Sequence, residues 1–417
     1  MKQWFSTLAL IVCLTLVSVA DAELRAGMGI RNVTPDPLLP ISGGGGEPIP
    51  SNDKRGELEI RALVVEQGDT RVAIVNAPYI GFPRVLGDRV RDRVKSIPGS
   101  NIVIGATHSH SAPEMYAFPD GKGGTWADLE YIDWVCTEVA KAIELAVVNL
   151  EPAKVKIATG EAKGKIAYNY YAPKLYDPRV NVMQFLDAEN KPFITLVNYA
   201  IHPEVLGPNS GFVSPDLVGP LHDRIEELGG GQGIFMNGAQ GGMVTADCRG
   251  PNGKDIQTWE ECIRIGNLLA KELLRIVKDA PVQEDANLYV AVRELEFPVE
   301  NEMMLGVVKY SPLGYPMSGE NTVSTQLNLI NLGNAQMITI PGEALPNIGY
   351  YLKEHMRGEH NFLLGLTNDG FGYILTREDF GSFKRYEYVT ETSLGERTGT
   401  IYVDEALAFI KNHPKPE

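Results

Sequence analysis

Apolar and polar positions along the chain switch between two periods, which predicts strands interleaved with helices. Arg61–Glu66 and Arg71–Asn76 have the apolar character of strands and are separated by a short polar turn, which predicts a hairpin. Apolar residues in 84–96 and 126–149 recur at helical spacing. The same criteria predict further strands at 102–106, 155–158, 180–186, 193–200, 288–297, 325–332, 335–340 and 362–366, and helices at 260–277, 345–355 and 404–412. This order favours the α/β class, with mixed β-sheets flanked by helices.

Two stretches of the chain repeat one order of elements. In IVNAPYIGFPRVLGDRVRDRV…NIVIGATHSHSAP and in LVNYAIHPEVLG…LVGPLHDRIEEL…GIFMNGAQGG, a strand ending in VN leads through a loop to a helix containing DR and then to another strand. A distant duplication and the ordinary recurrence of α/β units both explain the echo. In either case His108 and His202 come just after the carboxyl ends of strands, where open α/β sheets bind ligands.

Two of the seven histidines, His108 and His110, are one residue apart in the loop that follows the strand 102–106. In extended backbone both rings leave the same face of the chain. They can therefore bind one metal ion together, or one can bind the metal while the other transfers a proton. The structural alternative is that both rings hydrogen-bond the loop backbone.

Two glycine-rich segments lack the spacing of phosphate-binding loops. We interpret Asn237–Gly242 as a loop whose bare backbone lets a substrate or a metal site approach closely. Ser42–Pro48 has either a similar role or that of a flexible surface turn.

Composition and the N-terminus narrow the possible functions. A net charge of −15 argues against binding to nucleic acid or to anionic membranes. Residues 1–22 have the pattern of a cleavable signal peptide: Lys2, an apolar core at Leu8–Val19 and an A-x-A site at 20–22. We therefore expect a secreted or periplasmic protein without a transmembrane segment. Of the remaining cysteines, Cys248 and Cys262 pair in an oxidising compartment, or all three stay reduced and buried.

Five separated motifs resemble, in order, those of the neutral/alkaline ceramidase family. GMGIRNVTP resembles the opening strand and turn of the family, and ATHSHSAP resembles its THTHSGP segment. VNYAIHP resembles the segment with its second metal histidine, PGE its metal-binding glutamate, and GYILTREDFGSFKRYE its YxTxxEE…YE stretch. The resemblance spans almost the whole mature sequence. It implies a mixed α/β, ceramidase-like catalytic domain over 23–417, one zinc ion per chain, and amide hydrolase activity on N-acyl lipids.

Carried over residue by residue, the resemblance makes four residues the zinc ligands: His108, His202, Glu343 and Tyr373. It puts His110 beside the metal as a proton-transfer group, and Tyr386 opposite the reacting carbonyl. One extra residue separates Tyr386 from Tyr373 in comparison with the family pattern. Imidazole nitrogen and carboxylate oxygen are ligands that zinc takes in catalytic sites, where one position stays open for water.

The chain also departs from the family. Gly242 stands where the family has a serine near the zinc, and Tyr170 lies in the stretch where the family has an arginine. By the same resemblance, we expect the chain to lack the immunoglobulin-like C-terminal domain of full-length ceramidases. A metal-activated water needs no serine nucleophile, so we predict an exported zinc-dependent hydrolase of an amide or ester bond in a small-molecule or lipid-like substrate, with ceramide less favoured. The alternatives are a zinc-dependent lyase or lactonase, with His110 as the base, and a catalytically silent metal-binding protein.

Overall fold

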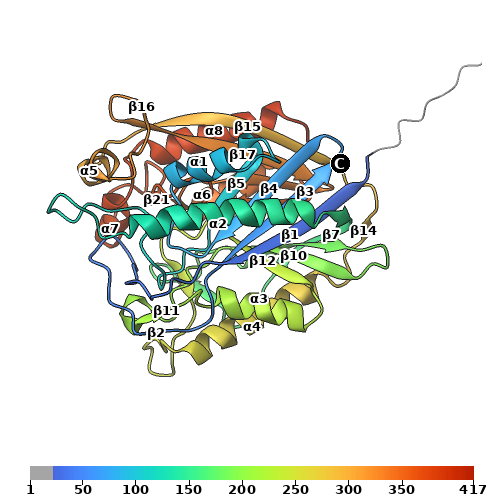
Figure 1. The fold of residues 1–417 in the computed structure, drawn as a ribbon, viewed down its shortest axis with the longest axis horizontal. Helices are drawn as coiled ribbons and strands as arrows, with labels where there is room; N and C mark the ends of the chain where they lie inside the picture. The colour runs from blue at the N-terminus through green and yellow to red at the C-terminus, as the bar shows by residue number, and fades with distance from the viewer. Residues whose placement is uncertain (1–21) are drawn as a thin grey trace, which may run out of the picture.

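The computed structural model describes residues 22–417, in which three larger β-sheets form the frame of the molecule (Figure 1). The first sheet has the order β5–β4–β3–β1–β6, with β1 (Leu24–Asn32), β3 (Glu59–Gln67), β4 (Thr70–Ala77), β5 (Ile102–Ala106) and β6 (Glu151–Pro152). The second has the order β12–β10–β9–β7–β14, with β7 (Lys154–Glu161), β9 (Arg179–Leu186), β10 (Pro192–Tyr199), β12 (Gln232–Asn237) and β14 (Val282–Gln283). The third has the order β15–β17–β18–β20, with β15 (Leu288–Pro298), β17 (Thr322–Leu332), β18 (Ala335–Thr339) and β20 (His360–Leu364), and β16 (Met317–Gly319) also pairs with β17.

Each sheet is built from the same unit of four strands and a helix. Three strands pair antiparallel in chain order, as β1, β3 and β4 do, and a helix then leads to a last strand that pairs parallel with the third. The second unit runs β7–β9–β10–α3–β12, and the third runs β15–β17–β18–α6–β20. The connecting helices are α1 (Arg84–Arg93), α3 (Val218–Glu227) and α6 (Pro346–His355). The echo found in the sequence is therefore structural, and it extends to a third unit that lacks the VN and DR signatures.

The sheets meet in a central apolar core, and each also has an outer core under helices. Along β3, Leu63 and Val65 face the central core while Ala62 and Val64 face the helices. Burial on both faces explains why these strands read as nearly continuous apolar runs. Figure 1 shows α2 (Leu129–Val148) across the first sheet, α3 and α4 (Trp259–Val277) beside the second, and α8 (Thr398–Asn412) beside the third.

The fold confirms the predicted α/β class with mixed sheets and the predicted hairpin, β3 with β4. The helix α8 begins earlier than its predicted start at 404, because buried Tyr402 donates a hydrogen bond to the carbonyl of Thr339 (2.9 Å) and packing outweighs the β-branched residues there. The helix α5 (Glu302–Tyr310) was not predicted. Cys136, Cys248 and Cys262 are all free and buried, so the pairing of Cys248 with Cys262 is absent.

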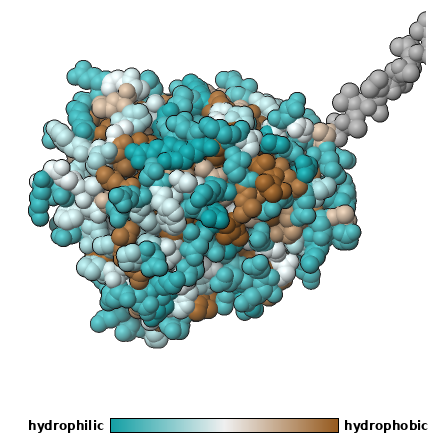
Figure 2. Space-filling view, viewed as in Figure 1, coloured by the Kyte–Doolittle hydropathy of each residue, from teal (hydrophilic) through white to brown (hydrophobic). Residues whose placement is uncertain are grey.

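The molecular surface in the view of Figure 2 is mainly hydrophilic, with apolar residues in separate patches. Within residues 22–417 we find no helix with the length and apolar character needed to cross a membrane. The expected signal peptide, residues 1–22, lies outside the described residues except for Ala22.

Candidate metal centre

The carboxyl ends of β5 and β10 and the segment after β18 bring three candidate ligands together. His108 follows β5, His202 follows β10, and Glu343 begins the short strand β19 (Glu343–Ala344) after β18. His108 has a positive φ of 73°, which turns the chain sharply just beyond its strand. The ends of these strands adjoin because the three sheets share one core.

Asn237, the last residue of β12, fixes both histidine loops. Its Nδ2 donates to the carbonyl of Thr107 (3.0 Å), which precedes His108, and to that of Ile201 (2.8 Å), which precedes His202. Its Oδ1 accepts from the backbone N–H of Ile201 (3.2 Å). One fully buried amide thus sets the spacing of two loops far apart in sequence.

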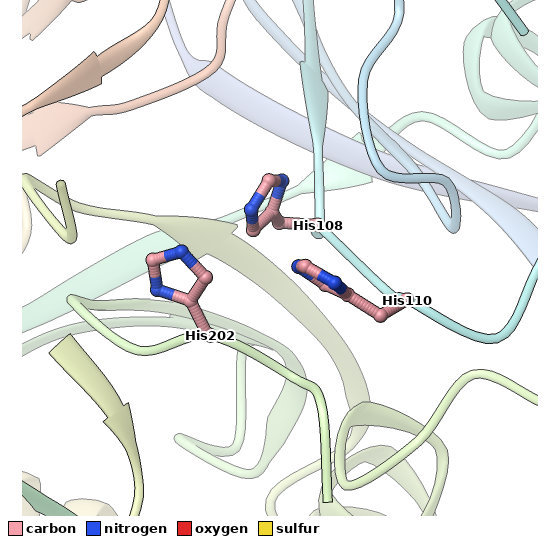
Figure 3. A group of neighbouring side chains, drawn as sticks. All are labelled: His108, His110 and His202. Carbon is pink, nitrogen blue, oxygen red and sulfur yellow. The ribbon is translucent and has the colours of Figure 1, made fainter. Parts of the chain in front are cut away.

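Each of the three histidines has its Nδ1 against a backbone carbonyl. The distances are 2.6 Å from His108 to Ile80, 3.0 Å from His110 to Gly43, and 2.8 Å from His202 to Val244. Since a carbonyl only accepts, Nδ1 carries the proton in each ring, and Nε2 of a neutral ring keeps its lone pair. Candidate ligand atoms of the three rings all lie within 4.8 Å of one another, and Figure 3 shows the rings gathered around one space.

Glu343 places a carboxylate beside two of these rings. Its Oε2 lies 3.1 Å from His202 Nε2 and 3.5 Å from His108 Nε2. β19 pairs in parallel with β21 (Tyr373–Ile374), and Glu343 is the direct partner of Tyr373 in that ladder. The Tyr373 hydroxyl donates to the sulfur of Met243 (3.3 Å).

The glycine-rich loop makes room for Glu343. A Cβ on Gly241 would lie 2.1 Å from the Glu343 carbonyl oxygen, and the Gly241 N–H donates to the carbonyl of Ala344 (2.9 Å). Only a residue without a side chain permits that approach. In the other glycine-rich run, the carbonyl of Gly43 accepts from His110, and Gly43, Gly44 and Gly45 line the cavity described below.

The electrostatics of the metal-free site leave one proton between His202 and Glu343. Burial lowers the pKa of His108 to about 3 and also lowers the pKa of His110, so both are neutral. Burial alone would lower the pKa of His202 too, but the hydrogen bond to Glu343 outweighs it and raises that pKa to about 9. Burial raises the pKa of Glu343, but the positive charge that His108 takes up in acid and the hydrogen bond with His202 outweigh it and lower that pKa to about 2.

The donor set fits a divalent metal ion of the zinc type. Among the described residues, His110 Nε2 is buried and has no hydrogen-bond partner, which is costly for an imidazole nitrogen unless an ion or a substrate group faces it. Imidazole nitrogens with a carboxylate oxygen match the ligands of catalytic zinc. The backbone carbonyls behind each ring supply the outer hydrogen bonds that orient such ligands.

A cavity of about 430 Å³ opens from the candidate metal centre. His108, His110, Glu343 and Tyr373 all line it, whereas His202 lies outside its lining. The rest of the wall is mainly apolar and aromatic, and much of it comes from α5: Met303, Met304, Val307 and Val308, with Phe118, Tyr315, Phe371 and Leu394. Such a cavity suits a ligand with an extended apolar part.

Tyr386, the predicted partner of the reacting carbonyl, does not line this cavity. It ends the 3₁₀ turn η3 (Lys384–Tyr386), and its ring centroid lies 5.7 Å from Tyr171 and 5.5 Å from Phe383. Tyr388, in α7 (Glu387–Glu391), lines the cavity instead, with its ring centroid 5.9 Å from that of Tyr373. The sequence YEY contains both tyrosines, so the tyrosine of the family motif can be aligned with Tyr388 as well as with Tyr386.

Two acidic residues near the site carried no sequence signal. Glu204 Oε2 lies 3.9 Å from His110 Nδ1. Asp369 is almost fully buried and lines the cavity. Both lie in loops after strands, where no periodic pattern distinguishes a functional acid from a structural one.

Solved structures with this architecture exist. The neutral ceramidase from Pseudomonas aeruginosa matches with a TM-score of 0.76 and 16% sequence identity over 95% of this chain and 76% of that chain. A ceramidase complexed with C2 matches with the same TM-score and identity, over 95% of this chain and 77% of that one. The fold is ceramidase-like. No protein-family model matches the chain, and no curated protein matches it. The ceramidase-like fold agrees with the fold that the five sequence motifs implied.

Proposed function

We propose that the protein is an exported, zinc-dependent hydrolase that cleaves an amide bond in an N-acyl compound with a long apolar part. The observation that carries this proposal is the convergence of three histidine rings and a buried carboxylate at one end of an apolar cavity. The likeness of the fold to ceramidases adds support for this reaction class. Export rests on the pattern of residues 1–22.

Four residues are proposed to hold the ion: His108, His202, Glu343 and Tyr373. The Nε2 atoms of His108 and His202 lie 3.5 Å and 3.1 Å from the same carboxylate oxygen, Oε2 of Glu343. Tyr373 stands next to Glu343 in the β19–β21 ladder. When bound there, zinc supplies a Lewis acid that polarises a carbonyl and lowers the pKa of water.

His110 is proposed to move the proton. Burial keeps its imidazole neutral, so Nε2 can accept a proton from the attacking water and return it to the leaving amine. The Gly43 carbonyl holds Nδ1 and fixes the ring orientation. The Glu204 carboxylate, 3.9 Å from Nδ1, favours the charged imidazolium that forms in between.

Tyr388 is proposed to take the role that the resemblance gave to Tyr386. Its phenol is a neutral donor, because burial and the nearby Glu343 raise its pKa above the ordinary value. A neutral hydroxyl in the cavity wall can donate a hydrogen bond to the oxygen of the scissile carbonyl as negative charge develops on it.

The apolar wall of α5 favours a lipid-like substrate over a polar one, and so it disfavours a lactonase on a polar substrate. Within that class, Gly242 and Tyr170 stand where the ceramidase motifs have serine and arginine. We therefore propose an N-acyl amide whose amine part differs from that of ceramide.

The experiment is turnover by the zinc-loaded protein in water enriched in ¹⁸O, with a panel of N-acyl amides, the matching esters and ceramide. Hydrolysis places one ¹⁸O in the released carboxylate, whereas elimination by a lyase releases an unsaturated product without it. Labelled carboxylate from an amide is the expected result. No labelled acid from any member of the panel would contradict the proposal.

A further inference from the structure

A second polar point lies in the wall of the same cavity. Asp369 follows β20, is only 4% exposed, and lines the cavity together with Glu343. Its Oδ1 accepts hydrogen bonds from the backbone N–H groups of Gly370 (2.9 Å) and Arg84 (3.2 Å). Within residues 22–417 no hydrogen bond reaches its Oδ2. Unlike His110 Nε2, Oδ2 is not sealed inside the protein but is open to the cavity, where a ligand group can donate to it.

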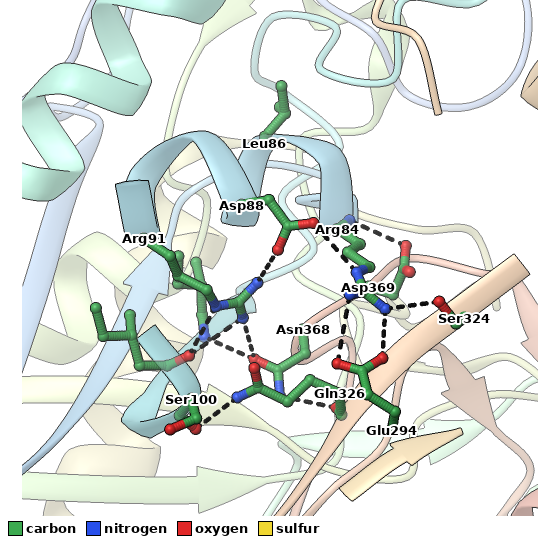
Figure 4. Close-up of polar contacts among 12 residues, drawn as sticks. Arg84, Leu86, Asp88, Arg91, Ser100, Glu294, Ser324, Gln326, Asn368 and Asp369 are labelled. Atoms are coloured by element: carbon green, nitrogen blue, oxygen red, sulfur yellow. Dashed lines mark hydrogen bonds and ion pairs between the residues drawn. The ribbon is translucent and has the colours of Figure 1, made fainter. Parts of the chain in front are cut away.

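The guanidinium group of Arg84, whose backbone N–H donates to Asp369, is engaged elsewhere. Arg84 donates from Nη1 to Glu294 Oε2 (2.6 Å) and to Ser324 Oγ (2.9 Å), and from Nε to Asp88 Oδ2 (3.2 Å). Figure 4 shows this side chain extended toward Glu294 and Ser324, with only its backbone N–H bonded to Asp369. Asp369 therefore has no cationic side chain paired with it, and burial raises its pKa to about 7.

The local charge favours a cation. Of the charged groups that line the cavity, Arg84 is held by Asp88 and Glu294, which lie outside the lining, and Glu343 belongs to the candidate metal centre, so Asp369 has no counter-ion. In a cavity with largely apolar walls, an added positive group restores the balance and supplies the hydrogen that Oδ2 lacks.

We propose that Asp369 binds a protonated amine that the substrate carries away from its scissile bond. The inference rests on the proposed function, because the amide occupies the metal end of the cavity while the ammonium group pairs with Asp369. The substrate class is then an N-acyl compound with a second, free amine, such as a mono-acylated diamine with an apolar chain between its polar ends.

The test compares octylamine with 1-octanol by titration calorimetry, using protein freed of metal with a chelator so that the amine has no metal to bind. The wild-type chain is expected to bind the ammonium form about tenfold more tightly than the alcohol. Asp369→Asn should abolish that preference. Asparagine keeps Oδ1 as the acceptor for Gly370 and Arg84, so the loop retains its hydrogen bonds, and thermal unfolding checks this.

Asp88→Asn is the matched control, because it removes a carboxylate from the other side of Arg84 and does not line the cavity. It should keep the preference for the amine. Equal binding of both probes by the wild type, tighter binding of the alcohol, or a preference that survives Asp369→Asn would each overturn the inference.

Failure of this inference is distinguishable from failure of the proposed function. Binding of octylamine requires neither metal nor turnover. An Asp369-dependent preference without hydrolysis of any amide would reject the hydrolase alone. Hydrolysis of amides without any preference for the amine would reject only the role of Asp369.

Discussion

His202 and Glu343 are 141 residues apart in the chain, yet Nε2 of the one lies 3.1 Å from Oε2 of the other. In the metal-free protein this contact holds a proton that a bound metal must displace. Because the pKa of His202 is raised to about 9, His202 is protonated throughout the neutral range, while Glu343, with its pKa lowered to about 2, is ionised. The contact therefore competes directly with metal binding.

The first prediction concerns pH. Zinc affinity should fall about tenfold for each unit of pH below about 9, because one proton is released for each ion bound. The metal-free protein has the opposite linkage: the protonated His202 contributes stability that is full below pH 6.5 and is lost as the pH rises through 9. Competition with a chromophoric chelator at several pH values measures the affinity, and an affinity independent of pH in this range would contradict the shared proton.

The second prediction separates the two neighbouring histidines. His108→Ala should lose zinc, because it removes a ligand next to Glu343. His110→Ala should retain about one zinc per chain and lose turnover by a factor of about 100 or more, because only the proton path is removed. Metal analysis and kcat on the same preparations decide between these roles. Loss of metal in His110→Ala would make His110 a ligand instead.

Much of the frame of this site could be predicted from the sequence. Ile102–Ala106 is buried on both faces, so its apolar run and its end at Thr107 were visible without a structure. The same holds for β10 before His202 and β18 before Glu343. A strand that is buried on both faces consists of apolar residues, so the change to polar residues marks its end in the sequence. The site residues follow such strand ends, and their positions could therefore be predicted.

The remaining parts of the site depend on contacts between distant segments. Tyr386 and Tyr388 lie in consecutive short turns, η3 and α7, whose few residues show no period that would indicate which ring faces the cavity. Asn237 reads as the start of a glycine-rich loop, and its two donated hydrogen bonds become apparent only when the Thr107 and Ile201 loops meet. The third repeated unit has no signal in the sequence for a similar reason, since its strand pairing repeats while its residue identities do not.

The third prediction tests Asn237 as the clamp between the histidine loops. Asn237→Asp keeps the shape of the side chain but replaces the amide nitrogen, which donates two hydrogen bonds, with a carboxylate oxygen, which only accepts. That oxygen would face the carbonyl oxygens of Thr107 and Ile201. The free energy of unfolding should fall by about 3 kcal/mol, measured by urea titration. Asn252→Asp is the control: Asn252 is exposed and uses its Oδ1 as an acceptor for the Lys254 N–H, which aspartate can also do. Equal stability of the two variants would show that the clamp is unimportant.

The fourth prediction compares the two tyrosines. On a hydrolysed amide, Tyr388→Phe should lower kcat about 100-fold through loss of a donor to the developing oxyanion, with zinc content unchanged. Tyr386→Phe should change kcat by less than about twofold, because its ring packs against Tyr171 and Phe383 outside the cavity. The reverse ranking would return the role to Tyr386.

The fifth prediction concerns the backbone that supports Glu343. A methyl group on Gly241 would lie 2.1 Å from the Glu343 carbonyl oxygen and 2.7 Å from its carbonyl carbon, so β19 must move away in Gly241→Ala. That movement pulls Glu343 from the histidines and opens the ladder to Tyr373. We expect a loss of about 2 kcal/mol in unfolding free energy together with weaker zinc binding. Gly44→Ala is the matched control, since no atom lies within 4 Å of its added methyl group. It should leave both quantities unchanged. A Gly241→Ala protein that binds zinc as tightly as the wild type would mean that Glu343 does not depend on this close approach, and would weaken its assignment as a ligand.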